Sequence, residues 1–209
     1  MHTHPVPLLP GFYYHIYNRG NNRENIFIEE RNYYYFLSLY TKYIEPVADT
    51  YAYALLRNHF HFLVRLKETS TTQDCQSSKD WQSCKTTKPS KSISRAFSNL
   101  FSTYTKAINK AYDRSGSLFE KPFHRKLIQD ERYFTTLVAY IHRNPQLHGF
   151  VDDFREWPFS SYQAILSSKD TRIQRGTTLD WFGDRQVFLN LHLSGLDFSE
   201  ISTWVEEDV

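Results

Sequence analysis

Asn58-His-Phe-His-Phe-Leu-Val-Arg-Leu66 is the stretch that decides the fold, because its aromatic and aliphatic residues predict a partly buried β-strand. Alternate residues of a strand point to the same face, so His59 and His61 project together with Cα atoms about 6–7 Å apart. Phe60 points the other way, toward the core. Two imidazoles at this spacing can bind one divalent metal, although a pair of exposed strand histidines is the simpler interpretation of this motif alone.

Strands and helices alternate around this stretch. Further strands are expected at residues 12–17 and 51–56, and the short Arg57-Asn58 joint predicts a hairpin. Apolar periodicity and stop signals predict helices at residues 31–43, 93–111 and 130–144, an extended segment at 117–129, and a last short helix at 181–193. This order predicts an α+β fold in which helices cover a small, mostly antiparallel sheet.

The chain divides into one domain and a tail. Residues 1–166 form the expected domain, with a flexible insert at about 68–90 that is rich in Ser, Thr, Gln and Lys. Residues 167–209 form an acidic and partly helical tail. Both cysteines, Cys75 and Cys84, lie in the insert, and two cysteines cannot build a disulfide framework.

Composition excludes several classes of protein. The 209 residues carry a net charge of +2, and 40% are hydrophobic, which excludes a fully disordered chain. No apolar run approaches the roughly 20 residues that span a bilayer, and the N-terminus lacks the pattern of a secretory signal, so we expect a cytoplasmic protein without a membrane partner. With 7 glycines and no phosphate-cradling loop, common nucleotide-cofactor enzymes are disfavoured.

Charge and aromatic content are compatible with nucleic-acid binding. Residues 79–126 hold eleven Lys and Arg against three acids, whereas acids dominate from Gly149 onward. Such a basic middle attracts a polyanion or is simply a solvated helix face. The 15 Tyr and 16 Phe fit an aromatic core and also fit stacking on unpaired bases.

A second motif, Tyr140-Ile-His-Arg-Asn144-Pro145, lies on the helix expected after residue 130. Positions i and i+4 share a helix face, so Tyr140 and Asn144 lie one above the other at the edge of the buried stripe. An amide oxygen is a suitable ligand for Mg²⁺ or Mn²⁺, although a boundary tyrosine and a cap before proline are the better interpretation of this motif alone. Together with the histidine pair, it suggests a metal that polarises a phosphate for attack by Tyr140.

Five segments in order make the sequence resemble the HUH single-strand DNA endonucleases, and within them the single-tyrosine, REP-associated tyrosine transposase-like proteins. The segments cover most of residues 12–165: Tyr14-His-Ile-Tyr-Asn-Arg-Gly20, Arg57-Asn-His-Phe-His-Phe-Leu-Val64, Gly116-Ser-Leu-Phe-Glu-Lys-Pro-Phe-His-Arg125, Tyr140-Ile-His-Arg-Asn-Pro-Gln-Leu-His-Gly149 and Trp157-Pro-Phe-Ser-Ser-Tyr162.

This resemblance implies a ferredoxin-like α+β sandwich whose central antiparallel sheet carries the HUH strand, with helices on one face. It implies that His59, His61 and Asn144 bind Mg²⁺ or Mn²⁺, where other branches of the family carry Gln in place of Asn144. It implies that Tyr140 attacks a phosphate of single-stranded, hairpin-forming DNA, which gives a 5′-phosphotyrosine and a free 3′-OH. Close relatives occur as monomers and as homodimers.

The residues that contact DNA are a further expectation. Asn18, Arg19, Lys121, Arg125 and Lys126 lie in or beside matched, basic segments and are candidates for phosphate contacts. Additional polar candidates without an assigned role are His124, His142 and His148. His142 lies two residues from Tyr140 and therefore points away from that helix face.

Two other functions compete with the transposase-like enzyme. One is a domesticated relative that binds structured single-stranded nucleic acid and does not cut it. The other is a metal-dependent phosphoesterase that uses water in place of Tyr140.

Overall fold

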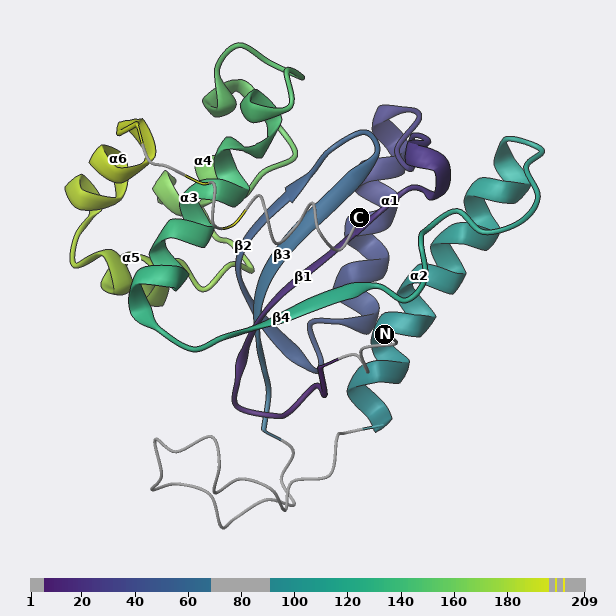
Figure 1. Cartoon of the computed structure of the whole chain (residues 1–209), viewed down its shortest axis with the longest axis horizontal. Helices are drawn as coiled ribbons and strands as arrows, with labels where there is room; N and C mark the ends of the chain where they lie inside the picture. The colour runs from purple at the N-terminus through teal and green to yellow at the C-terminus, as the bar shows by residue number, and fades with distance from the viewer. Residues whose placement is uncertain (1–5, 69–90, 196–197, 199–200, 202–209) are drawn as a thin grey trace.

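The computed structural model describes residues 6–68 and 91–195, together with Phe198 and Ile201. The insert expected at 68–90 falls almost wholly outside the described residues. Four strands form one antiparallel sheet in the order β2-β3-β1-β4. They are β1 (Tyr13–Arg19), β2 (Ala48–Leu55), β3 (His59–Leu66) and β4 (His124–Ile128). The strands and helices are arranged as shown in Figure 1.

The first six regular elements follow a βαββαβ order, with α1 (Glu30–Tyr43) after β1 and α2 (Lys91–Ala111) after β3. Crossovers of this kind place β1 and β3 in the middle of the sheet. The predicted ferredoxin-like α+β fold is therefore confirmed, with the histidine-bearing β3 as a central strand.

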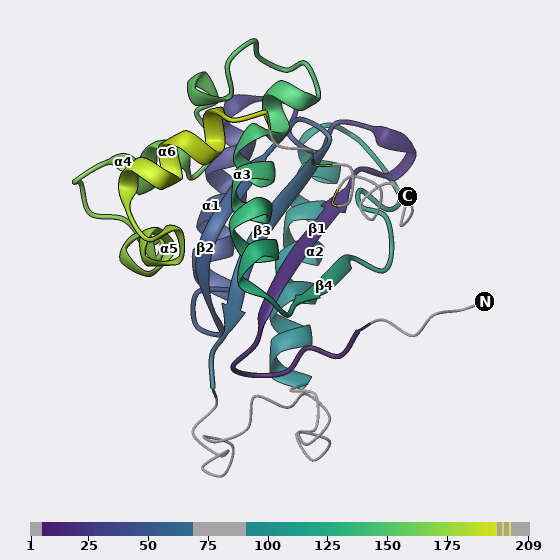
Figure 2. The same cartoon turned by 60° about the vertical axis from the view of Figure 1, so that its left-hand side comes forward.

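Strand alternation separates two cores. Tyr14 and Ile16 of β1 and Phe60 and Phe62 of β3 face α1 and α2 and are buried with them in the first core. Their neighbours along each strand face the other way, toward α3 (Glu131–Leu147). Figure 2 shows α3 on one side of the sheet and α1 and α2 on the other.

The expectation that the helices lie on one face of the sheet is wrong. It holds for α1 and α2, but α3 covers the second face because its apolar stripe packs on β2 and β3. An amphipathic helix with this much apolar surface requires a sheet face to cover it.

The C-terminal end of α3 also differs from the expectation that Pro145 stops it. Helix α3 continues through Pro145 to Leu147 and stops before Gly149, whose φ of +69° lies in the left-handed region. Pro145 has no backbone N–H to donate, and its ring crowds the carbonyl four residues earlier, so the helix ends within the next turn. Phe150 N–H donates to the Pro145 carbonyl at 2.8 Å. Asp130 caps the helix start as expected, by accepting from Tyr133 N–H.

The segment after residue 166 is folded onto α3. In place of one helix at 181–193 there are two, α5 (Arg175–Phe182) and α6 (Arg185–Leu193), because Gly183 at φ +84° ends the first and Asp184 caps the second. Phe182 and Phe188 lie in the core beside α3. The division of the chain at residue 166 stays a prediction.

Three short helices complete the described part. They are η1 (Asn21–Arg23), η3 (Phe154–Glu156) and α4 (Tyr162–Leu166). None of the described helices is both long and apolar enough to cross a membrane.

Candidate active site

His59 and His61 lie on the α3 side of β3, with ring centroids 5.2 Å apart. The strand alternation that buries Phe60 and Phe62 on the opposite face puts both imidazoles on this one. His59 begins the strand directly after the hairpin turn and is partly buried, whereas His61 is 1% exposed.

Helix α3 brings Tyr140 and Asn144 against these histidines. Phe134, Leu137 and Ile141 anchor the helix in the second core, which turns the Tyr140 ring toward the sheet. The rings of Tyr140 and His61 have centroids 5.7 Å apart in an edge-to-face arrangement. Asn144, one turn later, is fully buried. The four residues expected from sequence thus lie together.

His59 contacts two amide oxygens. Its Nδ1 lies 2.7 Å from Asn58 Oδ1, and its Nε2 lies 2.8 Å from Asn144 Oδ1. Burial lowers the pKa of His59 to about 4, and the nearby positive charge of Arg19 acts in the same direction. The imidazole is therefore neutral at pH 7 and has one N–H, so it can donate to only one of these oxygens. A cation between Nε2 and Oδ1 would satisfy both.

The two ring nitrogens of His61 have different surroundings. Its Nδ1 lies 2.9 Å from Nε2 of His15 on the adjacent strand β1. Its Nε2 is buried and has no hydrogen-bond partner among the described residues. Burial holds the pKa of His61 well below its usual value, and the charge of a protonated His15 would lower it further. A neutral His61 can thus present a lone pair from Nε2.

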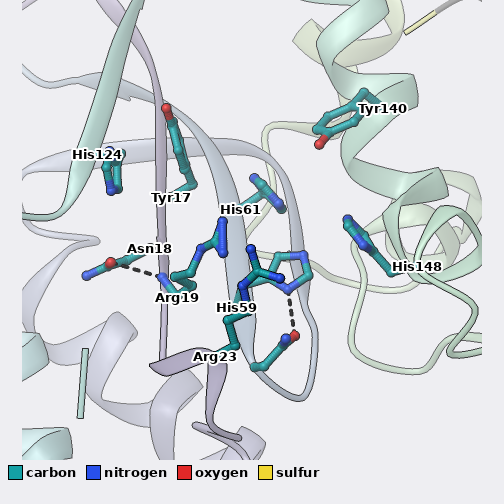
Figure 3. A pocket seen from close by; sticks show the side chains of 10 residues that line it. Tyr17, Asn18, Arg19, Arg23, His59, His61, His124, Tyr140 and His148 are labelled. Atoms are coloured by element: carbon teal, nitrogen blue, oxygen red, sulfur yellow. Dashed lines mark hydrogen bonds between the residues drawn. The ribbon is translucent and has the colours of Figure 1, made fainter. Parts of the chain in front are cut away.

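His59, His61 and Tyr140 line a cavity of about 350 Å³. Its other lining residues are Tyr17, Asn18, Arg19, Arg23, Asn58, His124 and His148. Figure 3 shows Tyr140 and His148 on one side of the cavity and Tyr17 and His124 on the other, with His59 and His61 between them. None of the described lining residues carries a carboxylate, and two are arginines. The charge of the cavity therefore suits an anionic ligand.

Comparisons with known proteins fit this geometry. No family model matches the chain. A protein of Haemophilus influenzae assigned as a REP-associated tyrosine transposase is 25% identical over 121 residues, which are 58% of this chain and 62% of the relative. The chain therefore matches less than two thirds of that relative's length. A solved structure of a REP-associated tyrosine transposase bound to a REP hairpin superposes with a TM-score of 0.55 and 15% identity, covering 80% of this chain and 86% of that one.

The chain is similar to REP-associated tyrosine transposases in both sequence and fold. The resemblance indicated by the five sequence segments is thereby confirmed.

The residues expected to contact DNA are only partly brought together. Asn18 and Arg19 line the cavity. Lys121, Arg125 and Lys126 do not. Lys121 is exposed in the segment before β4, and Lys126 lies over the Tyr133 ring at 4.8 Å on the α3 side of the sheet.

Arg125 lies on the opposite face of β4. It pairs across the sheet with Ile16, a residue of the first core, and its guanidinium lies 4.9 Å from the centre of the Phe123 ring. Burial lowers its pKa. A role of Arg125 in binding DNA stays a prediction, but it would act away from the cavity.

Sequence reasoning left several cavity residues without a role. Tyr17 lies across the sheet from both His61 and His124, and its ring stacks on the His124 ring at 5.0 Å. His148 continues the i, i+4 series of Tyr140 and Asn144, a spacing that was available in the sequence. No residue spacing predicts that Arg23 and Asn58 line the cavity, because both lie in turns. His142 is buried and hydrogen-bonded away from the cavity, as its position predicts.

Proposed function

We propose that the protein is a metal-dependent single-stranded DNA endonuclease and strand transferase with Tyr140 as its nucleophile. The observation that supports this most directly is a cavity without a carboxylate in its described lining, in which a tyrosine faces two histidines. A phosphodiester carries the charge that such a cavity suits. The similarity to REP-associated tyrosine transposases points to the same chemistry.

The polar atoms around His59 fit a divalent metal. No three His, Cys, Asp or Glu side chains of the described chain gather as a metal site, so the ligand set needs the Asn144 amide as its third member. Neighbouring ligands of an octahedral ion, each about 2.1 Å from the metal, lie about 3 Å apart. The distance of 2.8 Å between His59 Nε2 and Asn144 Oδ1 agrees with this. His61 Nε2, which has no hydrogen-bond partner among the described residues, supplies another ligand atom for the metal.

His59, His61 and Asn144 would therefore hold Mg²⁺ or Mn²⁺. When bound, such an ion supplies Lewis-acid polarisation of a phosphate oxygen. Imidazole and amide ligands accept several divalent ions, so this ligand set does not choose between the two.

Tyr140 supplies the nucleophile. Its phenol loses a proton to solvent, and its oxygen forms a bond to phosphorus. The bond from phosphorus to the 3′ oxygen breaks, and that oxygen keeps the electron pair and takes up a proton. The products are a DNA 5′-phosphate linked to Tyr140 and a free 3′-OH. Attack by another 3′-OH reverses the reaction and joins strands without an external energy source.

A hairpin-forming single strand is the proposed partner. The solved relative holds a REP hairpin, and Asn18 and Arg19 of this chain line the cavity beside the histidines. Because the tyrosine and the histidines of one chain lie together, a monomer supplies a whole site. We therefore propose that a second copy is not needed for chemistry.

The decisive experiment uses short DNA hairpins taken from the DNA that flanks the gene. The protein is incubated with a hairpin and Mg²⁺ or Mn²⁺, and a denaturing gel reveals a covalent protein–DNA band. We expect a metal-dependent band that Tyr140→Phe and His59→Ala abolish. Tyr133→Phe is the matched control, since Tyr133 lies on the same helix outside the cavity lining.

Each of the other outcomes favours a different function or a different nucleophile. Hairpin binding without any band favours a domesticated protein that binds structured single strands. Cleavage that survives Tyr140→Phe means that water or another group is the nucleophile, and the assignment of Tyr140 is then wrong.

A further inference from the structure

The loop between β1 and α1 holds Arg23 at the cavity in a strained conformation. Asn22 and Arg23 have φ angles of 55° and 60°, in the left-handed region that side chains other than glycine rarely adopt. Gly20 permits the close return of the chain, because a Cβ there would lie 2.0 Å from the Glu24 carbonyl oxygen. Strain of this kind costs roughly 1–3 kcal/mol per residue and is concentrated at functional sites.

Backbone hydrogen bonds fix this loop to the rest of the site. Gly20 N–H donates to the Asn58 carbonyl at 2.7 Å, and Asn21 N–H donates to the Leu118 carbonyl at 2.9 Å. Arg23 N–H closes the turn by donating to the Gly20 carbonyl at 2.9 Å. Asn58 precedes His59, so the loop that carries Arg23 is tied to the start of the histidine strand.

The charges near Arg23 in the described part of the chain are already paired or are themselves positive. Arg19, the other arginine of the cavity, lies 3.8 Å from Glu120. Arg114, nearby on the loop after α2, pairs with Glu24. Among the residues that the structure describes, no carboxylate lies within ion-pair distance of Arg23. Arg23 lines the same cavity as His59 and His61, and Figure 3 draws it on the side of the histidines away from Tyr140.

We infer that Arg23 binds a non-bridging oxygen of the DNA phosphate that Tyr140 attacks. This inference rests on the proposed function and adds a residue to it. A guanidinium presents planar, paired donors that match phosphate oxygens, and its charge is retained at any physiological pH. As the tyrosine oxygen adds to phosphorus, charge redistributes over the non-bridging oxygens, and Arg23 stabilises it from the side of the histidines away from the nucleophile.

The strained loop explains how a side chain on the surface can do this. A loop that became ordered only on binding would lose backbone entropy when its arginine meets the phosphate. A loop with two left-handed residues and fixed hydrogen bonds has its backbone already ordered. Energy is thus stored in the fold to place one charge at the cavity.

Single-turnover cleavage at saturating hairpin tests this inference. We expect Arg23→Gln to lower the rate at least about 100-fold, the scale for loss of one charge-stabilising donor. The hairpin Kd should change less than about 10-fold, because other phosphate contacts hold the DNA. Arg23→Lys should give an intermediate rate, since a lysine keeps the charge and loses the paired geometry.

Arg31→Gln is the matched control, because it also removes one exposed arginine but lies outside the cavity lining. A rate within about threefold of wild type for Arg23→Gln overturns the inference, as does a loss that saturating DNA restores. A melting curve confirms that each variant is folded.

Failure of the proposed function looks different. If the wild-type protein binds the hairpin and forms no covalent adduct, Arg23 is judged by binding alone. An unchanged Kd for Arg23→Gln then removes any role in phosphate binding. A loss of more than 10-fold, without the same loss in Arg31→Gln, would retain Arg23 as a phosphate ligand in a protein that does not cut.

Discussion

At the scale of single residues, the contact between His15 and His61 shows how a neighbouring strand prepares a metal ligand. His15 is 1% exposed, and burial lowers its pKa to about 3, so it is neutral at pH 7. One proton lies between His15 Nε2 and His61 Nδ1. When His61 donates it, the lone pair of His61 Nε2 is free to bind a metal. Metal-binding histidines usually donate their second N–H in this way.

We therefore expect His15→Leu to weaken Mn²⁺ binding by about 10- to 100-fold, the usual cost of removing such a partner. Isothermal titration calorimetry of the protein without DNA measures the Mn²⁺ affinity. Tyr40→Phe is the control, because it also removes a buried hydrogen bond, between the Tyr40 hydroxyl and Thr50, but lies outside the cavity lining on the opposite face of the sheet. Equal Mn²⁺ affinity in wild type and His15→Leu would contradict the role of His15. Absence of Mn²⁺ binding in both would contradict the metal site itself.

The sequence predicts which functional side chains lie together wherever residue spacing alone determines the face on which they point. The i, i+2 spacing of His59 and His61 and the i, i+4 spacing of Tyr140 and Asn144 each place two side chains on one face. His15 and Arg23 could not be found in this way. The contact of His15 with His61 depends on the register between β1 and β3. The position of Arg23 depends on left-handed backbone angles at Asn22 and Arg23, which the sequence does not predict.

At the scale of elements, α3 holds Tyr140 and Asn144 in place by contacts on its other side. His142 Nε2 lies 2.7 Å from Ser161 Oγ, and His142 Nδ1 lies 2.8 Å from His192 Nε2 of α6. Ser161 Oγ also accepts from Tyr53 N–H of β2 at 2.8 Å. This chain of hydrogen bonds joins β2, α3 and α6 in a region without solvent, and it fixes how α3 is rotated about its axis.

Ser161→Ala should therefore destabilise the fold by about 1–3 kcal/mol, since it leaves a buried backbone N–H and an imidazole nitrogen without a partner. Urea unfolding at pH 7 gives the change. Ser194→Ala, which removes an exposed hydroxyl at the end of α6, should cost less than about 0.5 kcal/mol. If both variants are equally stable, the hydrogen-bond chain does not support α3.

The order of elements was predictable because apolar periodicity is strong in α1, α2 and α3 and alternation is strong in β3. Helix ends were less so. Pro145 is a stop signal, and the helix does end soon after it, at Leu147, but the sequence could not show whether the last turn forms before or after the proline. The weak pattern of residues 175–193 concealed two helices because only Gly183 and Asp184 mark the break between them.

At the scale of the whole molecule, the fold separates the basic segment from the site. Much of the charge in residues 79–126 that is described belongs to α2, which packs with α1 on the face opposite α3. The basic middle of the sequence therefore does not line the cavity, whose charge comes from Arg19 and Arg23 at the end of β1. Charge counted along a chain could not show this, because it takes no account of which sheet face each element covers.

Four buried histidines and the partly buried His59 should also make the molecule sensitive to acid. Burial lowers the pKa of His15 to about 3 and those of His59 and His192 to about 4, and it holds those of His61 and His142 well below the usual value. In the unfolded chain these groups titrate near 6.5. Between about pH 6.5 and pH 4 the unfolded state therefore binds more protons than the folded state.

Stability should accordingly be full above about pH 6.5 and fall as the pH drops toward 4. Each such histidine contributes at most about 1.4 kcal/mol per pH unit within that window. Urea unfolding at pH 7 and pH 5 measures the free energy of unfolding, and we expect a loss of several kcal/mol at pH 5. A variant with His142 and His192 replaced by apolar residues should show a shallower dependence on pH, because two of the groups that take up protons on unfolding are gone. A free energy that is constant from pH 7 to pH 5 would mean that the histidines can charge within the fold, and that the second core is open to water.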